Sequence, residues 1–248
     1  MSCRDTQASL RVNSVGLAIA SLYKELTVMY SKLIRWSGAA SILGGICIAL
    51  FWTTHPWGRL DGTEVALSPA WLISHNFHFL GACLILLGLV GLYARQMEKA
   101  GNLGLIAFMI ALVGTAMFVG TGMLSAHLWP FIAIAAPDFV QANGPVFSLS
   151  PPRYVDLLVT GVLLIVGYVL MGIVTLRVGI LPRMAAWLLI AGAVIFNLPP
   201  YPIFSDLNIA GLPVPWILIV VGSLVFGAAF IWLGYALWSS EDQVLGEN

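Results

Sequence analysis

Long runs of apolar residues constrain this chain more than any other feature of its sequence. A helix needs about 20 apolar residues to cross about 30 Å of hydrocarbon, and only helices and closed barrels satisfy their backbone polar groups in lipid. Six runs reach or approach this length, at residues 33–54, 71–93, 103–129, 155–176, 183–198 and 214–238. We therefore predict an all-α fold, a polytopic transmembrane helix bundle with six spans.

The overall composition agrees with this prediction. Of the 248 residues, 60% are hydrophobic and 9% are charged, against roughly 25% charged residues in an average soluble domain. The net charge of zero gives no reason to expect a nucleic acid as partner. We expect the lipid bilayer as the main surroundings of residues 33–238, with a cytoplasmic segment at 1–32 and a short cytoplasmic tail at 239–248.

The fifth apolar run is the weakest of the six. It is shorter than the others and leads into Pro199, Pro200 and Pro202. Proline removes a backbone donor and clashes with the preceding turn, so it ends a helix. The run either spans a thin part of the bilayer or continues as irregular backbone packed against protein, and the prediction of six spans rather than five depends on it.

The basic residues predict the orientation. Nine of the eleven fall on one side of the predicted spans: Arg4, Arg11, Lys24, Lys32, Arg35, Arg95, Lys99, Arg177 and Arg183. Arg59 and Arg153 fall on the other side. Loops on the cytoplasmic side are enriched in Lys and Arg, so we predict that both ends of the chain are cytoplasmic.

The segment before the first span has an apolar residue at every third or fourth position: Val15, Ile19, Leu22, Leu26, Met29 and Leu33. Polar residues such as Ser21, Lys24 and Glu25 lie between them. This periodicity predicts an amphipathic helix that lies along the inner membrane surface. A poorly ordered tail whose pattern is accidental is the alternative.

The middle of every predicted span lacks Asp, Glu, Lys and Arg, which argues against a proton-coupled pump or an ion transporter. The four histidines, in contrast, gather toward the predicted outer side, and His75 and His78 share one helical face because they are three residues apart. Five further polar residues are predicted at a similar level and would form an outward-facing vestibule: His55, Asn76, Tyr154, Asp156 and Asn197.

Four interpretations of the outer histidines remain open. They form a hydrated rim at the membrane interface, or His75, His78 and His127 bind a metal ion such as zinc, copper or iron. Alternatively, His78 and His127 are the axial ligands of a haem. The last interpretation is a pocket for a quinone or another lipid. The spacing matches none of the recognised short metal-binding motifs.

Several boundary motifs resemble those of uncharacterised six-span bacterial membrane proteins. The motifs are Leu33-Ile34-Arg35-Trp36-Ser37-Gly38, Gly91-Leu92-Tyr93-Ala94-Arg95-Gln96, Gly179-Ile180-Leu181-Pro182-Arg183 and Trp232-Leu233-Gly234-Tyr235-Ala236-Leu237-Trp238. The resemblance implies a multi-pass protein of the bacterial plasma (inner) membrane, and it implies no particular activity.

The sequence thus favours a non-enzymatic membrane protein over an enzyme. We expect either a subunit of a membrane assembly, with another membrane protein or a second copy as partner, or a binder of a small apolar or lipidic ligand. The alternative is a metal- or haem-dependent membrane oxidoreductase that uses the outward-facing histidines.

Overall fold

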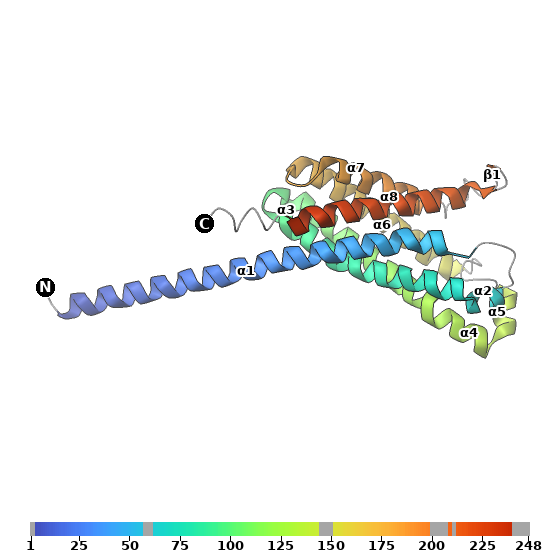
Figure 1. Ribbon diagram of the computed structural model, residues 1–248, viewed down its shortest axis with the longest axis horizontal. Helices are drawn as coiled ribbons and strands as arrows, with labels where there is room; N and C mark the ends of the chain where they lie inside the picture. Colours follow the sequence, from blue (N-terminus) through green and yellow to red (C-terminus); the bar gives the residue numbers. More distant parts are fainter. Residues whose placement is uncertain (1–2, 57–61, 144–150, 199–207, 210–211, 240–248) are drawn as a thin grey trace.

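The computed structural model describes residues 3–56, 62–143, 151–198, 208–209 and 212–239. The described part is helical except for one short antiparallel pair, β1 (Asn208–Ile209) with β2 (Leu212–Pro213). The helices are α1 (Cys3–Thr54), α2 (Gly62–Leu67), α3 (Pro69–Met123), α4 (Trp129–Ala135), α5 (Pro137–Asn143), α6 (Pro151–Val178), α7 (Arg183–Asn197) and α8 (Val214–Ser239), with a π-helical turn, η1 (Leu124–Leu128), between α3 and α4 (Figure 1).

Helix α3 contains two of the predicted spans, which meet at Gly101. The backbone at Gly101 has φ 58° and ψ −161°, a conformation that is not helical and that favours glycine. Residues on either side face one another across this point, since the rings of Tyr93 and Phe108 stack at 4.5 Å. Farther out, the indole Nε1 of Trp71 donates to the carbonyl of Ser125 at 3.0 Å. Residues 69–100 and 102–123 therefore form an antiparallel hairpin.

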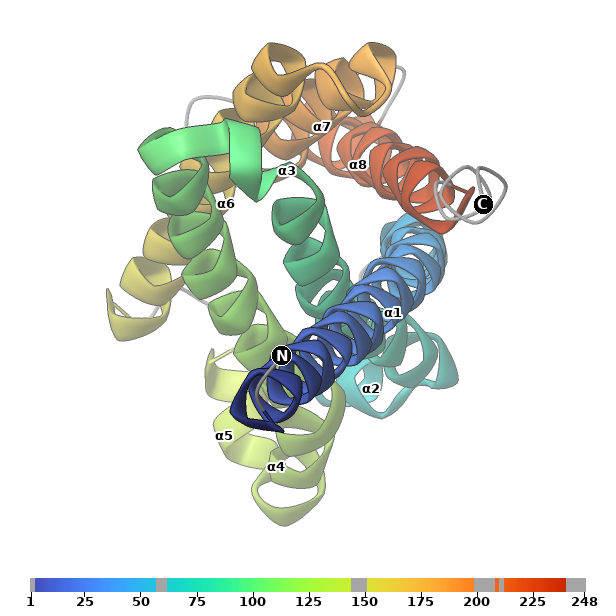
Figure 2. The ribbon, with the colours of Figure 1, turned by 90° about the vertical axis from the view of Figure 1, so that its left-hand side faces the viewer.

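The long helical segments pack in a closed ring (Figure 2). The first half of α3 packs on α1, its second half on α6, α6 on α7, and α7 on α8, which returns to α1. Glycines lie at these contacts: a Cβ on Gly45 of α1 would meet the backbone of α8, and one on Gly192 of α7 would meet Phe226. Small residues of this kind let membrane helices approach closely, because lipid supplies no hydrophobic force between them.

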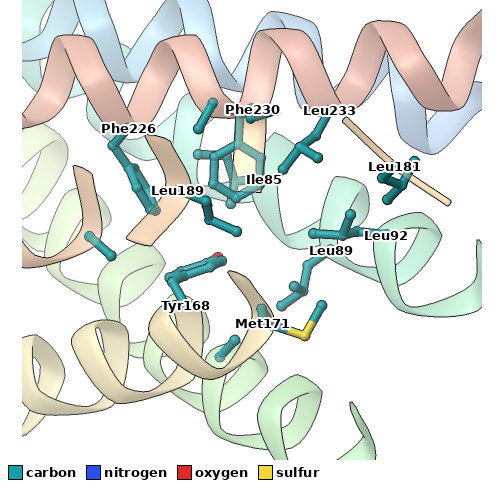
Figure 3. Close-up of a cluster of buried hydrophobic side chains, with 14 of the residues drawn as sticks. Ile85, Leu89, Leu92, Tyr168, Met171, Leu181, Leu189, Phe226, Phe230 and Leu233 are labelled. Atoms are coloured by element: carbon teal, nitrogen blue, oxygen red, sulfur yellow. The ribbon is translucent and has the colours of Figure 1, made fainter. Parts of the chain in front are cut away.

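The largest buried cluster fills the space enclosed by α3, α6, α7 and α8 (Figure 3). Phe226 and Phe230 of α8 lie with ring centroids 5.0 Å apart, and the ring of Tyr168 from α6 is 5.0 Å from that of Phe226. Leu89 of α3 and Leu189 of α7 are fully buried beside them. This cluster holds the helices in fixed positions around the ring.

Four helical segments are long and apolar enough to cross a membrane: Ile19–Thr54, Pro69–Ala135, Val155–Val178 and Val214–Ser239. The prediction of an all-helical membrane protein is thereby confirmed. The segment Pro69–Ala135 contains the hairpin at Gly101, and Arg183–Asn197 is a shorter apolar helix. The number of crossings and the orientation of the ends stay predictions.

The amino-terminal segment is helical, and its position along the inner membrane surface stays a prediction. Helix α1 continues through the predicted boundary at residue 33 and runs for 52 residues, about 78 Å at 1.5 Å per residue. Figure 1 shows it projecting from the bundle along the direction of the span. A helix on the membrane surface would need a sharp bend before the span, and no proline lies in α1 to cause one.

A π-helical turn interrupts the helix that follows the hairpin. The backbone N–H of Trp129 donates to the carbonyl of Leu124, five residues earlier, instead of to the residue four earlier. Pro130 comes next and has no N–H, so the Ala126 carbonyl loses its α-helical donor. Such single-turn π-helices widen a helix locally and often occur at functional sites.

Candidate functional site

Three of the four histidines meet in an aromatic cluster where α1 packs against the first half of α3. The rings of His55 and His75 have centroids 5.1 Å apart, and those of His75 and His78 are 6.4 Å apart. Phe51 lies between them, 5.4 Å from His75 and 4.5 Å from His78, and Trp71 stacks on His75 at 3.9 Å. We call these five residues the histidine cluster.

The hydrogen bonds of the histidine cluster assign the tautomers of two imidazoles. Nδ1 of His75 lies 3.0 Å from the carbonyl of Trp71, and Nδ1 of His55 lies 3.1 Å from the carbonyl of Pro56. A carbonyl only accepts, so each Nδ1 carries the proton and each Nε2 is left with a lone pair. Burial lowers the pKa of His55, which lies just beyond α1, to about 4, so this imidazole is neutral at pH 7.

His127 lies apart from the histidine cluster, on the π-helical turn. Its side chain is exposed, whereas His75 and His78 are 1% and 3% exposed. Its ring packs against Phe79 at 5.5 Å, and it lines an open groove of about 510 Å³. We call this the η1 groove; its lining residues are Gly120, Met123, Leu124, His127, Leu128 and Phe131.

The other predicted vestibule residues do not join these histidines through the contacts that the structure describes. The side-chain amides of Asn76 and Asn197 each donate to a carbonyl of their own helix, Leu72 at 2.7 Å and Ala193 at 2.8 Å. Asp156 lies near the start of α6, half-buried. The side chain of Tyr154 lies outside the described residues.

The geometry does not assemble the predicted metal ligands. Within the described ranges, no group of three or more His, Cys, Asp or Glu side chains is arranged to hold a metal ion. The side chains of His75 and His78 are buried, whereas that of His127 is exposed on the η1 groove, so the three do not share one site.

The predicted haem pair, His78 and His127, is not formed either. Axial ligands must face each other across a flat space large enough for a porphyrin. The ring of His78 is instead enclosed between Phe51 at 4.5 Å and Phe118 at 4.1 Å, which fill that volume. The residues present therefore do not fit a haem at this position.

The apolar residues that surround the histidines and form the groove were not predicted from the sequence. Phe51 and His55 are four residues apart, and Trp71, His75 and His78 recur at helical spacing, so a search for aromatic and imidazole side chains on one face would have found the cluster. Pro130, directly after the third apolar run, was the available signal for the groove, because proline disturbs a helix.

The η1 groove has the size and the lining of a ligand site. Its volume lies within the range of small-molecule pockets, about 300–1,000 Å³, and it combines apolar walls with one imidazole. Comparison with protein-family models, curated proteins and solved structures finds no match, so the chemistry of the groove is the basis on which a function can be assigned.

Proposed function

We propose that this protein is a six-span membrane protein that binds a small lipidic ligand in the η1 groove. The observation that supports this proposal is the exposed imidazole of His127, which lies in an otherwise apolar groove. The groove is on a helical segment that is apolar enough to lie in a membrane. Such a groove is open to lipid and presents one hydrogen-bonding side chain among its described lining residues.

The lining residues determine the chemistry of the ligand. Met123, Leu128 and Phe131 are 58%, 46% and 64% exposed, so they offer apolar surface to an acyl or isoprenoid chain. The imidazole of His127 offers a donor on one nitrogen and an acceptor on the other. We infer a neutral lipidic molecule with one hydroxyl or carbonyl group, which includes long-chain alcohols and quinones.

The position of His127 supports a ligand with a polar group that hydrogen-bonds to its imidazole in the η1 groove. A polar side chain in contact with hydrocarbon is costly unless it finds a hydrogen bond. The hydroxyl or carbonyl of a lipidic ligand supplies that hydrogen bond, and the apolar walls of the groove pack against the rest of the ligand.

The arrangement of the helices supports six crossings with both ends in the cytoplasm. The ring consists of α1, the two halves of α3, and α6, α7 and α8, each packed on its neighbour in the chain. Arg35 lies over the ring of Trp238 at 4.4 Å, so the predicted inner ends of the first and last spans adjoin one another. With the positive-inside rule, the η1 groove opens toward the outer leaflet of a bacterial plasma membrane.

A substitution that fills the groove tests the proposal. A Cβ on Gly120 would meet no atom within 4 Å, so Gly120→Leu extends into open space without displacing the chain. The matched control is Val113→Phe, which adds the same number of carbon atoms at an exposed position of the same helix, two turns away.

The measurement is mass spectrometry of the lipids that remain bound after purification in a mild detergent. We expect a lipid enriched over the bulk membrane extract with the natural protein and with V113F, and lost with G120L and with His127→Leu. The same bound lipids in all four proteins, at the same ratio to protein, would contradict the proposed site.

A further inference from the structure

One face of α1 carries a continuous apolar stripe that begins in the part projecting beyond the bundle and ends where α1 packs on α8. It is exposed along its length, and within the described structure only its last member, Trp36, has a ring contact with another helix, to Trp238 at 6.5 Å between ring centroids. Its members are Ile19, Leu22, Leu26, Met29, Leu33 and Trp36, with exposed fractions of 60%, 56%, 53%, 67%, 46% and 70%. Figure 1 shows the projecting part of α1 extending away from the other helices. We call this face the α1 stripe.

The spacing of the α1 stripe points to a specific partner. Its members alternate at three and four residues, a spacing that an amphipathic helix and the seam of a coiled coil share. In the sequence the same alternation extends back to Val12 and Val15, so the pattern covers more than three heptads. A helix that presents such a seam packs best against another helix with the same repeat.

The remaining positions of the helix fit this assignment. With Ile19 and Leu26 at position a and Leu22 at position d, Lys24 and Ser31 fall at position f, opposite the seam. Lys24 is exposed there and Ser31 is half-buried. Tyr30, at position e, instead attaches α1 to its own bundle, because its hydroxyl donates to the carbonyl of Ala94 at 2.7 Å.

We propose that the α1 stripe pairs with the α1 stripe of a second copy of this chain, as a parallel two-stranded coiled coil. Two copies in one membrane project their α1 helices to the same side, so a parallel seam forms without rearrangement of the bundles. Ile19 at position a with Leu22 at position d is the arrangement that favours two strands, and Leu26 and Leu33 occupy the next two a positions. The flanking g and e positions then bring Glu25 of one copy beside Tyr30 of its partner, and no like charges meet.

Site-directed disulfide cross-linking in membranes tests the seam. The background variant replaces the native thiols (Cys3→Ser, Cys47→Ala, Cys83→Ala). Single cysteines are then introduced by Leu22→Cys and Leu26→Cys on the stripe, and by Lys24→Cys and Ser31→Cys on the opposite face as matched controls. We expect an oxidised dimer with the two stripe cysteines and its loss with the two control cysteines, because a disulfide requires close Cβ atoms.

A second pair of variants distinguishes a specific interface along the α1 stripe from random collisions between α1 helices. Leu26→Glu, placed in the Leu22→Cys protein, should abolish the cross-link, whereas Lys24→Glu in the same protein should leave it unchanged. Equal cross-linking on both faces, or none at either stripe position, would overturn the proposal. So would strong quenching of a fluorophore at position 22 by nitroxides on lipid chains, which would place the stripe on the membrane surface instead.

Discussion

The hydroxyl of Tyr168 on α6 lies 2.6 Å from the hydroxyl of Thr115 on α3, in the centre of the bundle. Thr115 donates its own hydrogen to the carbonyl of Ala111, also at 2.6 Å. The hydrogen bond between the two hydroxyls is therefore donated by Tyr168, and the two partners are not equivalent. If Tyr168 is replaced by phenylalanine, Thr115 keeps its hydrogen bond to Ala111. If Thr115 is replaced, the Tyr168 hydroxyl loses its one partner among the described side-chain hydrogen bonds.

This asymmetry predicts different costs for the two conservative substitutions. Tyr168→Phe should lower the free energy of unfolding by about 0.5–1.5 kcal/mol, the usual net value of one hydrogen bond. Thr115→Val should cost more, about 1–3 kcal/mol, since it leaves the fully buried Tyr168 hydroxyl unsatisfied. Reversible unfolding in mixed micelles measures both, and the double variant should recover part of the loss. A larger cost for Tyr168→Phe would contradict the assigned donor.

The contact between α1 and α8 predicts an effect of a single methyl group. A Cβ on Gly45 would lie 2.5 Å from the carbonyl oxygen of Gly227, and one on Gly227 would lie 2.5 Å from that of Gly45. Because both obstacles are backbone atoms, Gly45→Ala should force the helices apart and cost about 1–3 kcal/mol, as overpacking does elsewhere. The control Gly120→Ala, which meets no atom within 4 Å, should not be destabilising. The thermal midpoint of unfolding should therefore be lower for Gly45→Ala than for Gly120→Ala.

His55 predicts a loss of stability in acid. Its folded pKa of about 4 lies below the value of 6.5 for an unperturbed histidine, so the unfolded chain binds the proton more readily. The destabilisation of the folded protein by this proton is zero above about pH 7, grows as the pH falls from 6.5 toward 4, and is complete below that, with an upper limit of about 3.4 kcal/mol. The His55→Gln variant should lose less stability between these pH values than the natural protein. Parallel curves for the two proteins would show that His55 is not buried as described.

The helices were predictable because apolar length and the positions of proline and glycine determine them locally. Five of the six predicted runs coincide to within one residue with parts of α1, the first half of α3, α6, α7 and α8, and Arg183 begins α7 as expected. The run at 103–129 covers the second half of α3 and continues through η1 to Trp129. The length of α1 was not predictable from charge, because the basic residues before position 33 mark the membrane boundary and do not end a helix. The segment before residue 33 and the first span would form separate helices only if α1 bent between them. The sequence has no proline there to cause such a bend.

The site was predictable in part. The clustering of His75 with His78 followed from their spacing on one helix, and His55 joins them through Phe51. The position of His127 could not be derived, because one additional residue in the π-helical turn rotates it relative to the preceding helix. A periodicity argument assumes a regular helix, and Pro130 removes that regularity.

The six-span arrangement, with the loop after α1 outside and the turn at Gly101 inside, is tested most directly by the accessibility of two single cysteines. Glu64 on α2 and Asn102 beside the hairpin turn are both exposed and lie at opposite ends of the bundle. In a variant without native cysteines, we expect Glu64→Cys to react with a membrane-impermeant maleimide added to intact cells, and Asn102→Cys to react only after permeabilisation. Labelling of Asn102→Cys in intact cells, with Glu64→Cys protected, would contradict the orientation and place the η1 groove in the inner leaflet.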